Sequence, residues 1–128
     1  MRRVLVVDDQ LGVREAIRMF LTRRGFRVDC ADSGRAAQRM VATHDYDLVI
    51  TDVFMADGDG IDLAQFMQDR RMMTPLISMS GGSANFAADK ALRSIAPYTA
   101  SMLEKPFQNR DLLDVVHKSL SFDVSYFE

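Results

Sequence analysis

Strand-like and helix-like stretches alternate along this chain from its first residues almost to its last, and this alternation limits the folds that it can adopt. Val4 to Val7 is a continuous apolar run, as expected of a strand that is covered on both faces. The other strand-like segments are residues 26–31, 47–52, a run that opens at Pro75, and 99–104. Helical spacing of apolar residues is found over 11–23, 34–43, 61–71, 84–96 and from Leu112 to Leu120. Such alternation predicts an α/β fold, (βα)5, on a parallel sheet.

Short polar and glycine-containing segments separate these elements. Gly25 is expected to end the first helix, and Asp32 or Ser33 to cap the helix over 34–43. The segment Asp57-Gly58-Asp59-Gly60 is typical of a turn, in which metal binding by the two aspartates is a minor option. Within the first helix, the expected buried face is formed by Val13, Ile17, Phe20 and Leu21, and the opposite face by Arg14, Glu15 and Arg18.

Length and composition favour a single domain outside the secretory pathway. We place the domain at residues 1–120 and a tail without an output domain at 121–128. The net charge of −2 offers no basic surface for nucleic acid and no electrostatic reason to bind a membrane. The single cysteine, Cys30, cannot form an internal disulfide, and the sequence shows neither a membrane-span pattern nor a signal-peptide pattern. A cytoplasmic location is therefore expected.

Polar side chains follow four of the predicted strands at the point where each strand ends. They are Asp8 and Asp9, Asp52, Ser80, and Lys105 before Pro106. Ligands of open parallel sheets bind outside the carboxyl ends of the strands, so neighbouring strands would bring these groups onto one patch. Carboxylate oxygens favour Mg²⁺, with Mn²⁺ as an alternative, while a hydroxyl and an ammonium suit phosphoryl oxygens. A cation or Lys105 must offset the repulsion among the carboxylates.

Each of these residues also has an ordinary structural interpretation. Strand-end aspartates are common, Ser80 could be a turn residue before Gly81, and Lys105 could be a solvated lysine before a helix. The combination is harder to explain in this way, because independent turns seldom end at one sheet edge with these side chains. The Lys105–Pro106 bond is compatible with either isomer. His44 and His117 lack metal-ligand spacing and are interpreted as surface or helix-end residues.

At these residues the chain resembles a response-regulator receiver domain, over almost its whole length. The matching pieces occur in receiver-like order and spacing: Asp8-Asp9, the segment from Thr51 to Gly60, Ser80, and Lys105-Pro106-Phe107. The resemblance implies a doubly wound parallel sheet with the flavodoxin-like strand order 2-1-3-4-5.

The resemblance also implies a chemistry. Asp52 would accept a phosphoryl group from a phosphohistidine of a histidine kinase or histidine phosphotransfer protein. Asp9 and Asp52 would bind Mg²⁺ directly with the backbone carbonyl of Phe54, and Asp8 would act through water. Lys105 would bridge to the phosphoryl group, and Ser80 would move to hydrogen-bond it. Such a domain is not a classical enzyme, although it promotes its own phosphorylation and slow dephosphorylation by positioning and charge neutralisation.

Some positions depart from the family pattern. Met102 stands where the family usually has an aromatic switch residue, three residues before Lys105. A thioether can fill that space but cannot report movement of Ser80 through a ring flip. Ala56 replaces a proline. At the positions that tune dephosphorylation in the family, Phe54 and Gly82 provide no side chain to orient an attacking water.

The expected role is a stand-alone switch, a phosphorelay shuttle or a phosphate sink, either monomeric or dimerising on phosphorylation. By resemblance, a downstream protein would dock on the face formed by the fourth helix, fifth strand and fifth helix. The alternative is a pseudo-receiver that docks proteins without phosphorylation, although its acids and Lys105 are all present. A phosphatase that forms an aspartyl phosphate is a further alternative, but it would need a second acid soon after Asp52, where Val53 and Phe54 stand. A flavodoxin-like electron carrier is also an alternative, because it has the same strand order.

Overall fold

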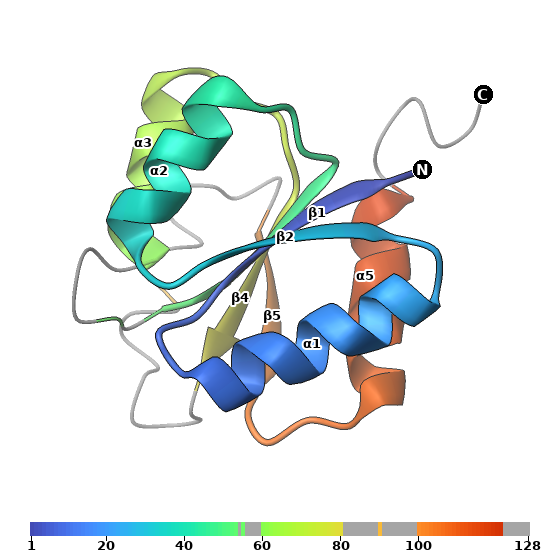
Figure 1. The fold of residues 1–128 in the computed structure, drawn as a ribbon. Coiled ribbons are helices and arrows are strands. Elements are labelled where there is room, and N and C mark those ends of the chain that lie inside the picture. Colours follow the sequence, from blue (N-terminus) through green and yellow to red (C-terminus); the bar gives the residue numbers. More distant parts are fainter. Residues whose placement is uncertain (54, 56–59, 81–89, 91–99, 122–128) are drawn as a thin grey trace.

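In the computed structural model, which describes residues 1–53, 55, 60–80, 90 and 100–121, five parallel strands form one sheet in the order β2-β1-β3-β4-β5 (Figure 1). The strands are β1 (Arg3–Val7), β2 (Arg27–Ala31), β3 (Leu48–Asp52), β4 (Leu76–Ser80) and β5 (Ala100–Glu104). The helices are α1 (Leu11–Arg23), α2 (Gly34–Thr43), α3 (Gly60–Asp69) and α5 (Asn109–Leu120). The predicted doubly wound α/β fold and its strand order are confirmed.

Several predicted features lie outside the described residues. Among them are the turn residues 57–59, the loop at 81–82 and nearly all of the helix over 84–96, of which only Lys90 is described, as a helical and exposed residue. Most of the predicted tail, from residue 122 onward, lies outside as well. None of the described helices is long and apolar enough to cross a membrane.

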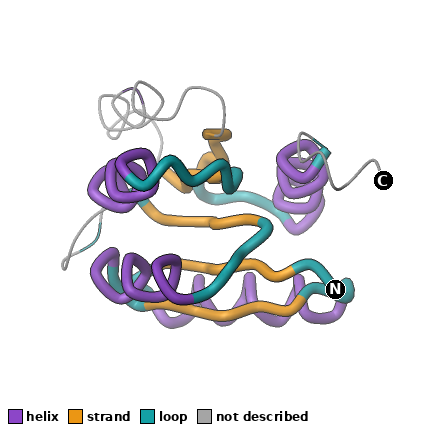
Figure 2. The backbone as a smooth tube through the Cα atoms, turned by 90° about the horizontal axis from the view of Figure 1, so that it is seen from above, coloured by secondary structure: helices purple, strands orange, loops and turns teal. Residues whose placement is uncertain are grey.

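Helices cover both faces of the sheet, and the alternation of side chains along β1 shows why. Val4 and Val6 belong to one apolar cluster, which also contains Leu21 of α1 and Val116 of α5. Leu5 and Val7 point to the other face and belong to a second cluster, formed with residues of α2 and α3 such as Val41 and Leu63. Figure 1 shows α2 and α3 on one side of the strands and α1 and α5 on the other, and Figure 2 shows the same arrangement from above. With both faces buried, the strand must be apolar throughout, as the sequence indicated.

The ends of the helices refine the sequence-based boundaries. Ser33, rather than Asp32, caps α2, because its Oγ accepts a hydrogen bond of 3.1 Å from the amide of Ala36. Gly25 follows α1 with a φ of 92°, as expected for a helix-ending glycine. The prediction that the third helix reaches Arg71 is wrong. The helix ends at Asp69, since Arg71 has a left-handed φ of 56°.

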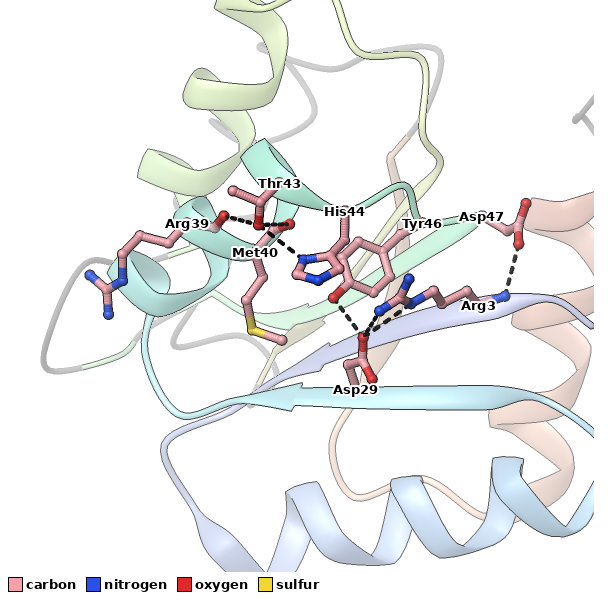
Figure 3. A network of polar contacts seen from close by, with 8 residues as sticks. All are labelled: Arg3, Asp29, Arg39, Met40, Thr43, His44, Tyr46 and Asp47. Atoms are coloured by element: carbon pink, nitrogen blue, oxygen red, sulfur yellow. Dashed lines mark hydrogen bonds and ion pairs between the residues drawn. The ribbon is translucent and has the colours of Figure 1, made fainter.

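A polar network ties β1 and β2 to the segment that leads into β3 (Figure 3). Oδ2 of Asp29 accepts hydrogen bonds from Nε and Nη2 of Arg3, at 3.1 and 2.9 Å, and from the hydroxyl of Tyr46, at 2.8 Å. The guanidinium of Arg3 also lies over the Tyr46 ring, 5.2 Å from its centre. The backbone amide of Arg3 donates to Asp47 at 2.8 Å. The network therefore anchors the exposed edge of the sheet through β2.

These contacts set the protonation of Asp29. Burial alone would raise its pKa, but the hydrogen bonds from Tyr46 and Arg3 outweigh burial, so the pKa of Asp29 lies below its ordinary value. Burial and the bond to Asp29 raise the pKa of Tyr46. A carboxyl whose pKa is lower in the folded state stabilises the fold above its unfolded pKa. That stabilisation is lost as the pH falls through the folded value.

Removal of the Tyr46 hydroxyl tests this network. We expect Tyr46→Phe to lower the free energy of unfolding by about 1–2 kcal/mol at pH 7, because Asp29 loses a hydrogen bond in a half-buried site. The difference from the wild type should shrink as the pH falls below roughly 4, where the carboxyl is protonated first in the unfolded chain and, at lower pH, in the folded protein. Urea unfolding across this pH range measures both effects. A variant as stable as the wild type at pH 7 would contradict the assignment.

Candidate functional site

The strand register brings the predicted polar residues to one edge of the sheet. Val7, the last residue of β1, pairs with Thr51, so Asp8 and Asp52 follow at the same level of neighbouring strands. On the other side of β3, Asp52 pairs with Met79, the residue before Ser80. Ser80 in turn pairs with Glu104, the residue before Lys105. Parallel strands thus place all of these residues at their common carboxyl edge.

Lys105 connects the acids across this edge. Its Nζ lies 3.1 Å from Oδ2 of Asp8 and 3.2 Å from Oδ2 of Asp52. The Asp8 side chain is fully buried, whereas those of Asp52 and Lys105 are 14% and 20% exposed. Lys105 is followed by Pro106 through a cis peptide bond, one of the two isomers that the sequence left open.

The protonation of Lys105 follows from these partners. Burial alone would lower the pKa of the ammonium, but the hydrogen bond to Asp8 and the negative charges of Asp52 and Asp8 outweigh burial. The pKa of Lys105 therefore lies above its usual value, and the side chain is charged at neutral pH. The ammonium offsets part of the repulsion between the two carboxylates.

Four hydrogen bonds fix Asp8 in place. Its amide donates to the carbonyl of Ala31 on β2, and its carbonyl accepts a 2.8 Å bond from Nη1 of Arg14. Oδ1 of its carboxylate accepts from the amide of Gln10 at 2.9 Å, which leaves Oδ2 for Lys105. Both oxygens of a fully buried carboxylate are thus satisfied, as its burial demands.

The carboxylates of Asp8, Asp9 and Asp52 form a set of oxygen ligands. One oxygen from each lies within 4.8 Å of the others. Asp8 is buried, Asp52 is partly exposed and Asp9 is exposed, so the cluster opens toward solvent on the Asp9 side. A hard, oxygen-only set of this size fits Mg²⁺ or Mn²⁺ in its chemistry. Phe54, whose carbonyl was expected to bind the ion directly together with Asp9 and Asp52, lies outside the described residues.

Ser80 ends β4 between the strands that carry Asp52 and Lys105. Its side chain is buried, with 2% of the residue exposed. Its backbone carbonyl accepts a 2.6 Å hydrogen bond from the amide of Lys105, so the ends of β4 and β5 are joined directly at the site. The structure therefore places Ser80 next to the backbone of Lys105.

Two contributors to the site were missed by reasoning from the sequence. Arg14 was expected on the polar face of the first helix, but it is partly buried and its guanidinium holds the Asp8 carbonyl. Gly60 was assigned to a turn, but it begins α3, and its amide donates to the carbonyl of Val53 at 2.8 Å. A basic residue one turn into a helix and a glycine near a turn are too common to signal such contacts in advance.

The chain belongs to the family of response regulator receiver domains, because the model for the "Response regulator receiver domain" matches residues 4–117. It is 27% identical over 115 residues to the cell cycle transcriptional regulator CtrA of Caulobacter vibrioides, covering 90% of this chain and 48% of CtrA. With the regulatory protein AtoC of Escherichia coli it shares 32% identity over 118 residues, which is 92% of this chain and 25% of AtoC.

The fold agrees with this family. The structure of response regulator TrrA from Thermotoga maritima, in complex with Mg²⁺–BeF, is similar with a TM-score of 0.80 at 27% identity, covering 94% of this chain and 100% of TrrA. The chain spans half or less of the length of the curated relatives CtrA and AtoC. The family is one of two-component signal transduction, a signalling family rather than a family of classical enzymes.

Replacement of Lys105 tests the balance of charge at this site. We expect Lys105→Met to lower the free energy of unfolding by roughly 2 kcal/mol at pH 7 and low salt, because Asp8 and Asp52 lose their shared cation. Saturating Mg²⁺ should reduce the difference from the wild type, since the ion would supply the missing positive charge. Urea unfolding with and without Mg²⁺ is the measurement.

Lys118→Met is the matched control, because Lys118 is an exposed residue of α5. Its effect should stay within about 0.5 kcal/mol and should not respond to Mg²⁺. Equal effects of the two substitutions would show that Lys105 does not balance the acids.

Proposed function

We propose that this domain is a Mg²⁺-dependent phosphoacceptor in which Asp52 receives a phosphoryl group from a phosphohistidine of a histidine kinase or histidine phosphotransfer protein. The observation that carries the proposal is the position of Lys105 Nζ, 3.2 Å from Asp52 and 3.1 Å from Asp8, beside three clustered carboxylates. A cation and an acidic metal-binding set next to a partly exposed carboxylate are the parts that phosphoryl transfer needs.

Asp52 is suited to be the attacking group. Of the two acids paired with Lys105, Asp8 has no exposed side-chain surface, whereas 14% of Asp52 reaches solvent, so a donor meets Asp52 first. An oxygen of Asp52 forms the new bond to phosphorus while the phosphorus–nitrogen bond of the donor breaks, and the imidazole leaves with the electron pair. Lys105 then faces an acyl phosphate, and its ammonium is within reach to neutralise the phosphoryl oxygens.

Asp8, Asp9 and Asp52 are the residues that would hold Mg²⁺, with the Phe54 carbonyl added by resemblance and Mn²⁺ as a substitute ion. When bound, the ion supplies positive charge that offsets the carboxylates and the phosphoryl oxygens. The complex of TrrA with Mg²⁺–BeF supports this assignment, as does the oxygen-only character of the three acids. Asp8 is fully buried and already bonded to Gln10 and Lys105, which favours its proposed role through water, with Asp9 and Asp52 as the direct carboxylate ligands.

Ser80 and Met102 are the proposed readout of phosphorylation. Ser80 would hydrogen-bond the phosphoryl group, and its carbonyl is already tied to the amide of Lys105. Met102 lies on β5, pairs with Ser78 of β4 and is 38% exposed, so it is available on the face proposed for a downstream protein. A flexible thioether at this position would adapt to a partner rather than switch between two ring orientations.

We further propose a cytoplasmic role as a switch, a relay shuttle or a phosphate sink. The protein is either a monomer throughout or a dimer that forms on phosphorylation. Action as a stand-alone domain stays a prediction. CtrA and AtoC are longer regulators of which the chain matches 48% and 25%, so a comparable whole-protein role is a proposal only.

Phosphorylation of Asp52 can be tested by intact mass. After incubation with Mg²⁺ and acetyl phosphate, the wild type should gain one phosphoryl group, and Asp52→Asn should gain none because the amide cannot attack. Asp69→Asn, which changes an exposed aspartate of α3, should behave as the wild type. A phosphoryl group on Asp52→Asn would refute the assignment. Failure of the wild type with both acetyl phosphate and a phosphorylated histidine donor would favour the pseudo-receiver.

The roles of the two adjacent acids can be separated by Mg²⁺ titration. We expect Asp9→Ala to weaken Mg²⁺ binding by roughly tenfold more than Asp8→Ala, because a direct ligand contributes more than one that acts through water. Asp8→Ala should instead cause the larger loss of stability, since Asp8 is the buried partner of Lys105. Calorimetric titration and urea unfolding of both variants give the two quantities. Equal losses of Mg²⁺ affinity would contradict the proposed division of roles.

A further inference from the structure

We infer that Gly60 is a positioning residue for the phosphoacceptor site, because it lets the first turn of α3 rest directly on the backbone of Asp52 and Val53 and so fixes where the Asp52 carboxylate lies. This inference rests on the proposed function of Asp52. It assigns to Gly60 a role beyond that of beginning a helix.

The backbone of Gly60 is in close contact with the end of β3. A Cβ built on Gly60 would lie 2.6 Å from the carbonyl oxygen of Asp52 and 3.1 Å from Cα of Val53. Real Cβ atoms essentially never come within 3.0 Å of another atom in this way, and here the obstructing atoms belong to backbone. Gly60 also donates its amide to the carbonyl of Val53 at 2.8 Å. The residue is therefore both a spacer and a hydrogen-bond donor to the strand that carries Asp52.

Neither side of this contact can move freely to admit a methyl group. The end of β3 is held by its neighbours, since Val53 donates its amide to Met79 of β4 and Thr51 pairs with Val7 of β1. On the other side, α3 is held through its apolar face, where Leu63 and Met67 are buried in the cluster formed with α2. Because packed interiors give way only with strain, an added methyl group must displace the Asp52 backbone or α3.

A buried glycine in the first turn of a helix needs a reason, because alanine is the better helix former. Gly12 shows the contrast. It lies in α1, and a Cβ built there would meet no atom within 4 Å. An alanine therefore fits at position 12, whereas at position 60 its Cβ would clash with backbone atoms of Asp52 and Val53.

The consequence for the site follows from its geometry. Asp52 must stay close to Lys105 Nζ and to the oxygens of Asp8 and Asp9 at once. A shift of its backbone by several tenths of an ångström changes all of these distances together. Reactions that depend on positioning lose about two orders of magnitude in rate for a misplacement of about 1 Å.

The experiment compares Gly60→Ala with two controls in the full chain. Gly12→Ala adds the same methyl group to a helix in open space, and Met67→Ala removes buried side-chain atoms from α3 while leaving Gly60 unchanged. Thermal unfolding first establishes the temperature at which each variant is folded. The rate of phosphorylation by acetyl phosphate at saturating Mg²⁺ and the Mg²⁺ affinity without a phosphodonor are then measured at that temperature.

We expect Gly60→Ala to slow phosphorylation at least tenfold and to weaken Mg²⁺ binding several-fold, while both controls stay within twofold of the wild type. A folded Gly60→Ala within twofold of the wild type on both measurements would overturn the inference, as would an equal loss in Met67→Ala. A wild type that takes no phosphoryl group, either from acetyl phosphate or from a phosphorylated histidine donor, would overturn the proposed function instead. The Mg²⁺ affinities would still decide the role of Gly60, because they need no phosphodonor.

A second measurement decides the matter if Gly60→Ala does not fold. Hydrogen exchange of the Gly60 amide is followed in the wild type with and without Mg²⁺. Coupling between this amide and the site predicts that Mg²⁺ slows its exchange, with the same midpoint as the shift of the Asp52 amide resonance. An exchange rate of Gly60 that does not change while the Asp52 resonance shifts would overturn the inference.

Discussion

The pairing of Lys105 with Asp8 and Asp52 is the interaction on which the functional edge of the sheet depends. Two like charges about 4 Å apart repel by roughly 4 kcal/mol at the effective dielectric of a protein surface. An acidic cluster of this kind is stable in the folded protein only when a cation lies among its members. Lys105 fills that role from β5, two strands away from Asp52 in the sheet. To reach Asp52 and Asp8, its side chain extends past the end of β4, where Ser80 lies.

Because the pairing spans several strands, it depends on a sheet edge that cannot shift. The central strands are buried on both faces by separate apolar clusters, and the edge strand β2 is anchored by the Arg3–Asp29–Tyr46 network at a distance from the acids. Asp8 is held by α1 through Arg14, and the backbone that follows Asp52 is held by α3, because the Gly60 amide bonds the Val53 carbonyl. The helices thus act on the site through backbone contacts at the strand ends, in addition to covering the sheet.

The sequence predicted the parts of this structure that depend on local pattern. The periodicity of apolar residues along the sequence identified the strands and most helices. The resemblance supplied the strand order that places Asp8, Asp52 and Lys105 at one edge of the sheet. Contacts made through the backbone left no such pattern. The bond from Arg14 to the Asp8 carbonyl, the close approach of Gly60 and the left-handed Arg71 all depend on how elements meet in three dimensions. Every residue has a backbone carbonyl group, so the amino-acid sequence carries little information about which carbonyl a distant side chain or helix will contact.

The same geometry indicates how a change at Asp52 would reach the surface. A phosphoryl group on Asp52 would compete with the carboxylates of Asp8 and Asp52 for the three N–H donors of Lys105, whereas Asp8 is fixed by burial and by the Gln10 amide. An added phosphoryl group would therefore move Lys105 rather than Asp8. The amide of Lys105 is bonded to the carbonyl of Ser80, so such a movement would act on the ends of β4 and β5 together. Met102 lies on β5 within the same strand pair and is partly exposed, so a movement of these strand ends would be felt beside an exposed side chain.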